Sequence, residues 1–333
     1  MQPDGSSFAL PAFFVGPIPV YGTAVLSPMD GYSDLPFRSI CRELGSAMSY
    51  SEFIGAIGIL GGYPHLEDKL VYLPQEHPVV YQIFDNDPDR LLEAALHLEA
   101  GQIAPGYKPD IIDVNLGCSD RSVSNRGAGA GLLRTPHLIA EIFQKLTRHL
   151  HLPVTAKIRL GWDHASRNYL EVARILEDNG AALIAVHGRT RSQGYTGKAD
   201  WDAIAEVVQA VSIPVLGNGD VRTVADMDRL KAHTGCAGVM IGRSAVANPW
   251  LFARLDRGQV ALDQVRSTMY AHLQRNLDYF GPHLGLLRFR KNADTYLRPY
   301  SLFSELRHSL LTTTDVDQFK VLVEKVLSSP FIA

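Results

Sequence analysis

Cysteine is scarce in this 333-residue chain, which contains only Cys41, Cys118 and Cys236. They lie far apart, and no two of them have the Cys-x-x-Cys spacing. Neither a disulfide framework nor a zinc or iron–sulfur site is therefore predicted, and we expect no bound metal. Unpaired cysteines fit a reducing compartment, so the cytoplasm is the expected location.

Long apolar runs are also missing, and no membrane span is expected. The first 22 residues lack a basic segment and are interrupted by Pro11, Gly16, Pro17 and Pro19, unlike a secretory signal peptide. A net charge of −3 argues against a protein that coats nucleic acid non-specifically, although it is compatible with a local basic patch. The length predicts one large α/β domain with a small appendage.

Short apolar runs alternate with helical patterns along the first 260 residues. The expected strands are 24–29, 47–53, 79–84, 111–116, 154–160, 182–187, 214–218 and 238–242. Helices are expected between them, including 88–100, 136–150, 169–179 and 223–233. Eightfold strand–helix alternation is typical of a (β/α)8 TIM barrel, and the alternative is an open doubly wound sheet.

The two ends of the chain depart from this alternation. Residues 12–22 are expected to form a hairpin or plug at the N-terminal face of the barrel. After about residue 260 only helical patterns remain, among them 286–300 and 316–327. We therefore expect a barrel catalytic domain over residues 1–260 and a helical domain over residues 261–333.

Polar residues gather where the expected strands end, which is where the active site of this fold lies. With the neighbouring Pro28, Met29, Gly219 and Gly242, they are Ser27, Gln82, Asn115, Cys118, Lys157, Arg159, His187, Asn218, Asp220 and Arg243. A lone cysteine or histidine at a strand end is more often a core residue. Polar ends on seven strands that point to one mouth instead predict a functional site.

The last two strand ends indicate a phosphate. In this fold the loops after strands seven and eight commonly bind one with backbone N–H groups and a helix N-terminus. Gly217, Gly219 and Gly242 allow close approach of the backbone, and Arg243 adds a charge-assisted donor. A phosphorylated cofactor is the leading hypothesis.

Lys157 suggests which cofactor it is. A lysine inside a parallel strand is costly unless it meets an anion or polar ligand, although it could also pair with a barrel carboxylate. Gln82, Lys157 and His187 suit the carbonyl and N–H edge of a flavin, and Lys157 would stabilise negative charge on the reduced ring. Pyridoxal phosphate is the rival, but no partner for its pyridinium nitrogen is evident.

Nearly the whole chain resembles the tRNA-dihydrouridine synthase family, whose members are flavin enzymes that reduce uridine in RNA. The matching motifs, in order, are SPMDGYSDLPFR, VNLGCSDRSVSNRGAGAGLL, AKIRLGW, VHGRTRSQGYTGKADW, VLGNGDV and GVMIGRSAVANPW. The resemblance implies FMN as the bound cofactor and NADPH as its reductant. The FMN ligands it implies are Pro28, Met29, Gln82, Lys157, His187, Asn218, Gly219, Asp220, Gly242 and Arg243.

The same resemblance implies roles on the substrate side. Cys118 would be the general acid that protonates uracil carbon 5 after hydride reaches carbon 6, and Asn115 would help hold the uracil. A thiol with a pKa of about 8.5 is mostly protonated at neutral pH and can donate without activation. Arg159 and Arg189 are further candidates for contact with the substrate, with Arg191 beside them.

The helical tail is expected to contact tRNA. Leu286, Phe289, Ala293 and Tyr296 form one helical face, and Arg288, Lys291, Thr295 and Arg298 lie on another. Such a basic stripe is otherwise a solvated surface, but the family has an RNA-binding helical domain here. The predicted RNA contacts are Arg121, Arg288, Lys291 and Arg298.

The chain departs from the family pattern near Cys118. The usual proline after the cysteine is Ser119, the usual lysine two residues further is Arg121, and Ser27 replaces the alanine before the Pro-Met turn. We interpret these as variation in an active, monomeric enzyme. Two other functions remain open: a flavin reductase of a small molecule, such as a free pyrimidine or an enone, and an RNA-binding module that has lost catalysis.

Overall fold

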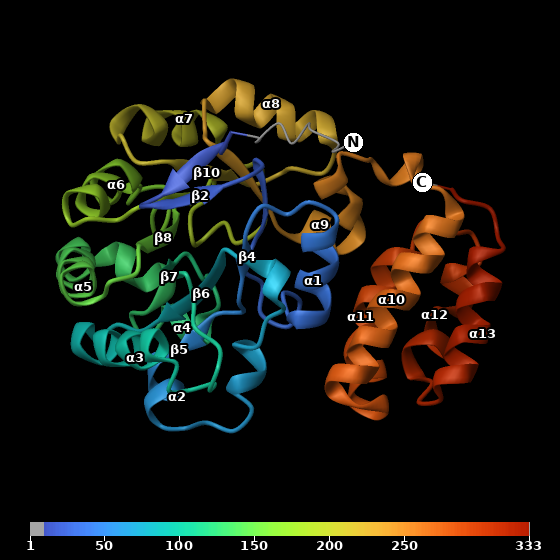
Figure 1. The fold of residues 1–333 in the computed structure, drawn as a ribbon. Coiled ribbons are helices and arrows are strands. Elements are labelled where there is room, and N and C mark those ends of the chain that lie inside the picture. The colour runs from blue at the N-terminus through green and yellow to red at the C-terminus, as the bar shows by residue number, and fades with distance from the viewer. Residues whose placement is uncertain (1–9, 333) are drawn as a thin grey trace, which may run out of the picture.

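The computed structural model describes residues 10–332 and confirms a barrel of parallel strands surrounded by helices (Figure 1). The barrel strands are β3 (Ala24–Leu26), β4 (Ser49–Tyr50), β6 (Val79–Phe84), β7 (Ile111–Leu116), β8 (Val154–Arg159), β9 (Ile184–His187), β10 (Val215–Asn218) and β11 (Gly238–Ile241). The predicted TIM barrel is therefore correct, and the open doubly wound sheet is not.

The strands pair in the order β3-β11-β10-β9-β8-β7-β6-β4. Between the two end strands of this order, the Ala47 backbone N–H donates to the Ala24 carbonyl oxygen at 2.8 Å. That bond brings the first and second strands together, so the barrel is nearly closed. All the strands therefore present their carboxyl ends at one mouth.

The expected second strand, 47–53, is divided in the structure. It contains β4 and continues into β5 (Ile54–Gly55), which pairs with β6 further along. At the break the Gln82 backbone N–H donates to Ser51 Oγ at 3.0 Å instead of to a main-chain carbonyl. A side chain thus replaces the backbone partner, and the regular ladder is interrupted.

Helices cover the outside of the barrel, as Figure 1 shows for α3, α5, α6, α7 and α8. The helices of the barrel are α1 (Leu35–Glu43), α2 (Ala56–Leu60), α3 (Pro88–Ala100), α4 (Arg121–Ser124), α5 (Pro136–His149), α6 (Tyr169–Asp178), α7 (Trp201–Ala210), α8 (Val224–Thr234) and α9 (Arg243–Ala247). Those predicted from the sequence agree within one residue at each end. None of the helices in residues 10–332 is both long and apolar enough to cross a bilayer.

A hairpin closes the N-terminal end of the barrel, as predicted for residues 12–22. Strands β1 (Phe13–Val15) and β2 (Ile18–Val20) pair antiparallel. Phe13, Val15 and Val20 are buried in one cluster with inward side chains of the barrel, including Val25 and Met240. The first nine residues, which begin the stretch judged unlike a signal peptide, lie outside the described part of the chain.

Four helices form the C-terminal region, on the right of Figure 1. They are α10 (Leu262–Phe280), α11 (Pro282–Leu297), α12 (Phe303–Thr312) and α13 (Val316–Leu327). The predicted apolar face of α11 is confirmed, since Leu286, Phe289, Ala293 and Tyr296 are all buried. Their cluster also contains Trp250 from the barrel side, so the two parts share a core, and the domain boundary near residue 260 stays a prediction.

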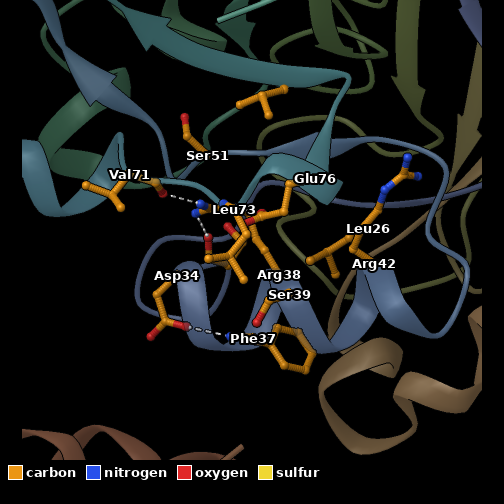
Figure 2. Close-up of polar contacts among 12 residues, drawn as sticks. Leu26, Asp34, Phe37, Arg38, Ser39, Arg42, Ser51, Val71, Leu73 and Glu76 are labelled. Atoms are coloured by element: carbon orange, nitrogen blue, oxygen red, sulfur yellow. Dashed lines mark hydrogen bonds and ion pairs between the residues drawn. The ribbon is translucent and has the colours of Figure 1, made fainter. Parts of the chain in front are cut away.

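A buried ion pair supports the segment that follows β3 (Figure 2). Arg38 Nε donates to Glu76 Oε2 at 2.9 Å, and both side chains are almost completely buried. The same guanidinium donates to the carbonyl oxygens of Ser33 at 3.0 Å and Val71 at 2.7 Å. Helix α1 is thereby tied to the loop that carries Pro28 and Met29 to the mouth of the barrel.

Candidate active site

A cavity of about 1260 Å³ opens at the carboxyl ends of the strands. Every residue predicted to bind cofactor or substrate lines it, together with Cys118. These residues are Pro28, Met29, Gln82, Asn115, Cys118, Lys157, Arg159, His187, Arg189, Asn218, Gly219, Asp220, Gly242 and Arg243. Distant segments therefore meet at one site, as the barrel topology requires.

Strand register determines which of these side chains are neighbours. Asn115 on β7 lies opposite Lys157 on β8, and His187 on β9 lies between Arg159 on β8 and Asn218 on β10. Side chains directly across a sheet stand close enough to interact. The register thus places a thiol loop, an ammonium and an imidazole around the same cavity.

The loop after β7 holds Cys118 in place through Asn115. Asn115 Oδ1 accepts hydrogen bonds from the backbone N–H groups of Gly117 at 3.1 Å and Cys118 at 2.8 Å. The Cys118 carbonyl accepts one from Ala130 at 3.1 Å. A Cβ at Gly131 would lie 2.5 Å from the Ser124 carbonyl oxygen, so the glycine-rich sequence allows the loop to fold back on itself.

Cys118 is suited to donate a proton. Its side chain is partly buried and lines the cavity. Burial raises the pKa of the thiol above its ordinary value, because the charged thiolate loses hydration. The thiol is therefore protonated at neutral pH, the form that a proton donor requires, and its role as the general acid stays a prediction.

Lys157 faces the cavity without a carboxylate partner. Within residues 10–332 the Lys157 ammonium forms no ion pair, so the alternative that it pairs with a barrel carboxylate is not observed. Its polar contact is Asn218 Oδ1 at 3.3 Å. Asn218 Nδ2 donates to the Met240 carbonyl at 2.7 Å, and this orients its oxygen toward Lys157. Burial, with repulsion from Arg159, lowers the pKa of Lys157 to about 8, so it is mostly charged at neutral pH.

His187 is neutral in this setting. Burial and the surrounding cations, Arg159 first among them, hold the pKa of its imidazole well below the usual range. Arg189 Nη1 lies 3.3 Å from His187 Nε2. Because a guanidinium only donates, Nε2 is the acceptor and the ring proton lies on Nδ1. His187 can therefore offer one N–H donor to a ligand.

The two arginines predicted to contact substrate have several contacts within the protein. Arg189 donates to both carboxylate oxygens of Asp220, at 2.7 and 2.8 Å, and to backbone carbonyls of the loop after β9. Arg159 donates to the carbonyl of Gly117 at 2.8 Å and to two carbonyls of that same loop. Arg159 and Arg189 therefore connect the loops at the mouth of the barrel. Their contact with substrate stays a prediction.

The predicted RNA contacts lie outside the cavity lining. Arg121 is exposed on α4. On α11 the Arg288 guanidinium lies 4.2 Å from the Phe280 ring. Arg298, which directly follows α11, forms an ion pair with Asp294. The Lys291 ammonium is half-buried, 4.7 Å from the ring of Tyr32 in the cavity wall. Burial lowers the pKa of Lys291.

Among the residues that the sequence reasoning missed, two contact predicted ligands of the site. Tyr195 lines the mouth with the Arg243 guanidinium 4.0 Å from its ring, and no local signal marks it in its polar loop. Asp113 is completely buried beneath Gln82 and Asn115. An acidic residue between the apolar positions of β7 was a usable signal for it, because unpaired buried carboxylates are rare.

Within residues 10–332, no group of three or more His, Cys, Asp and Glu side chains is arranged to hold a metal ion. The model of the dihydrouridine synthase (Dus) family matches residues 25–329. The chain belongs to this family. The protein is 36% identical over 312 residues to tRNA-dihydrouridine synthase B of Pseudomonas aeruginosa, which covers 91% of this chain and 92% of the relative.

Other dihydrouridine synthases are similar over shorter or comparable lengths. The probable tRNA-dihydrouridine synthase of Aquifex aeolicus is 39% identical over 239 residues, 69% of this chain and 72% of that protein. The Vibrio cholerae tRNA-dihydrouridine synthase B is 32% identical over 312 residues, 91% and 95% of the two chains. Among solved structures, histamine dehydrogenase from Rhizobium sp. 4-9 shares the fold, with a TM-score of 0.55, 12% identity, and coverage of 78% and 50%.

Proposed function

We propose that this dihydrouridine synthase reduces uridine in tRNA to 5,6-dihydrouridine, with FMN as bound cofactor and NADPH as electron donor. Family membership supports the reaction, and the tRNA substrate follows the names of its relatives. The observation that carries the proposal is the meeting of a protonated thiol, Cys118, and an ammonium without a carboxylate partner, Lys157, in one large cavity.

The residues present fit FMN. Lys157 and His187 offer donors to a ring edge, and the exposed Arg243 at the start of α9 offers a charged donor to a phosphate. At Gly219, φ is +124° and a Cβ would lie 2.7 Å from Ala199 Cβ, so the backbone there accepts no larger residue. When bound, FMN supplies the hydride that reduces the pyrimidine ring.

Side chains of the protein supply the proton for the uracil and bind the base. Cys118 holds its proton at Sγ and delivers it to carbon 5 of the uracil. Asn115 lies at the same wall and binds the base edge. A uridine within folded RNA must be extruded from its stack, at a cost of a few kcal/mol, before it reaches this cavity.

Basic residues outside the cavity would bind the RNA backbone. Arg121 begins α4, three residues after Cys118, whereas Arg288 and Lys291 lie on α11 and Arg298 directly follows it. Phosphate contacts of this kind position a nucleic acid without reading its sequence. They favour a tRNA substrate over a free pyrimidine or an enone, which would not need them. We expect the enzyme to act in the cytoplasm as a monomer.

The deciding experiment is mass spectrometry of tRNA from a strain that lacks this gene. Loss of dihydrouridine at one or more positions is expected, and its return on complementation with the wild-type gene is the control. Purified protein incubated with FMN, NADPH and the unmodified tRNA should restore the same positions. Unchanged dihydrouridine in the deletion strain, together with inactivity in vitro, would contradict the proposal. Reduction of a free pyrimidine but not of tRNA would instead support the small-molecule reductase.

A further inference from the structure

A continuous chain of hydrogen bonds runs beneath the cavity floor from Asp113 to the Cys118 loop. Gln82 Nε2 donates to Asp113 Oδ2 at 2.7 Å, and Asn115 Nδ2 donates to Gln82 Oε1 at 2.9 Å. Asn115 Oδ1 then accepts from the backbone N–H of Cys118. At its other end, Asp113 Oδ1 accepts from Thr155 Oγ1 at 2.6 Å.

The direction of every bond in this chain is forced. A backbone N–H can only donate, so Asn115 must turn its oxygen toward Gly117 and Cys118 and its NH2 group toward Gln82. Gln82 must then turn its oxygen toward Asn115 and its own NH2 group toward Asp113. The residue at position 113 has to accept, and a carboxylate satisfies this requirement.

The directions of these hydrogen bonds also determine which group Asn115 can offer to a ligand in the cavity. Asn115 has both of its oxygen's acceptor positions occupied by backbone N–H groups and one of its two N–H donors occupied by Gln82. The group that remains for the cavity is its second N–H donor. A donor suits the carbonyl oxygens of a uracil, whereas the exocyclic amino group of a cytosine would meet it donor to donor.

We infer that Asp113 is a positioning residue that sets the direction of the Gln82 and Asn115 amides, so that Asn115 presents a donor to the substrate base and holds the Cys118 backbone. Asp113 is completely buried and does not line the cavity, so it cannot touch the ligand and orients the base-facing amide through these partners. The network stands on the contacts alone. Only the identity of the base it faces rests on the proposed function.

A reciprocal exchange of carboxylate and amide tests this inference. In Asn115→Asp the carboxylate at 115 and Asp113 both face Gln82 as acceptors, and no orientation of that amide satisfies both. Adding Asp113→Asn gives Gln82 a donor on one side and an acceptor on the other. Each hydrogen bond between the side chains at 113, 82 and 115 then runs in the opposite direction, and the net charge equals that of the wild-type protein.

The first measurement is urea unfolding of the purified proteins in alkaline buffer, which keeps the carboxyl groups ionised. We expect Asn115→Asp to lower the midpoint by about 1 M, and the double variant to recover about half of that shift. Thr155→Val is the matched control, since it also removes a partner of Asp113 but does not decide the amide direction. When Thr155→Val is combined with Asn115→Asp, the two decreases in urea midpoint should add, and no stability should be recovered. A double variant no more stable than Asn115→Asp would overturn the inference.

The second measurement is uridine reduction by the flavin-loaded double variant. Its carboxylate at 115 presents an acceptor to the uracil carbonyls, so we expect turnover at least about 100-fold below wild type although part of the lost stability is recovered. Wild-type turnover in the double variant would overturn the donor role of Asn115. If wild-type protein itself reduces no uridine, the proposed function fails, and the unfolding results still decide the network.

Discussion

At the scale of the residue, burial acts on two groups of the site in the same way: it favours the neutral form. For Cys118 the pKa rises and the thiol keeps its proton, while for Lys157 the pKa falls to about 8. The thiol is thereby prepared as an acid without a neighbouring base. The lysine retains its charge near neutrality by a small margin, so its function depends on pH.

The role of Cys118 can be tested by Cys118→Ala. We expect flavin binding, followed by visible absorbance, to be unchanged, because the thiol does not contribute to the predicted FMN ligands. Uridine reduction should fall by about 10² to 10⁴, the usual contribution of a general acid. Cys236→Ala is the control, since this buried cysteine does not line the cavity. Near-normal turnover by Cys118→Ala would remove it from the mechanism.

Lys157 predicts a pH dependence of FMN binding. The ammonium is present below its pKa of about 8 and is lost above it, so affinity should weaken as the pH rises through 8. Loss of one charge-assisted hydrogen bond of about 1.5 kcal/mol corresponds to roughly a tenfold weaker Kd. Fluorescence titration of FMN across this range measures it. In Lys157→Arg the side chain stays charged across this range, so FMN affinity should not change with pH. A wild-type affinity that does not change with pH would contradict the prediction.

At the scale of the element, the loop after β3 depends on a buried ion pair between α1 and the segment before β6. Arg38 binds Glu76 and the carbonyl oxygen of Val71 (Figure 2), and it also donates to the carbonyl oxygen of Ser33. Removing one partner of such a pair leaves an uncompensated buried charge. The stability of α1 and the position of the Pro28–Met29 turn are therefore linked.

Glu76→Gln should lower the free energy of unfolding by about 3 to 5 kcal/mol, because Arg38 keeps its charge in a dry environment. Urea unfolding at neutral pH provides the measurement. Glu43→Gln is the matched control: its ion pair with Arg275 is partly exposed, and its loss should cost at most about 1 kcal/mol. Equal effects of the two substitutions would show that burial of the Arg38 pair does not dominate.

At the scale of the whole molecule, the barrel supplies most of the cavity wall, and α11 of the C-terminal region contributes Thr295 to it. The predicted RNA contacts also come from both parts: Arg121 lies on α4 of the barrel, Arg288 lies on α11, and Arg298 directly follows α11. The two parts share a core around Trp250, and Arg275 of α10 binds Glu43 of α1 at 2.8 Å. A tRNA that contacts both parts would meet one continuous protein surface.

Alanine substitution of Arg121, Arg288 and Arg298 tests these contacts. For each phosphate contact removed, we expect weaker tRNA binding and a slope of log affinity against log salt that is smaller by about one. FMN binding should not change. Arg266→Ala is the control, because Arg266 lies on α10, binds both Asp263 and Glu324, and is not one of the predicted RNA contacts. A salt slope that stays the same in all three variants would place the RNA elsewhere.

The sequence by itself determined the barrel, the residues at its mouth and the buried face of α11, because each depends on a local period or on a residue's place near the end of a strand. Strands β6 and β7 were predicted to the residue for this reason. Even the cavity lining followed, since parallel strands bring their carboxyl ends to one mouth.

Only the tertiary structure decided which side chains are partners. Lys157 faces Asn218, Arg189 binds Asp220, and Asp113 orients Gln82, all across strands or loops distant in sequence. Such pairs depend on strand register and on the direction of each hydrogen bond, neither of which a single strand encodes. The motif predicted Cys118 as the proton donor, but the contacts that hold Cys118 in place are set by neighbouring strands.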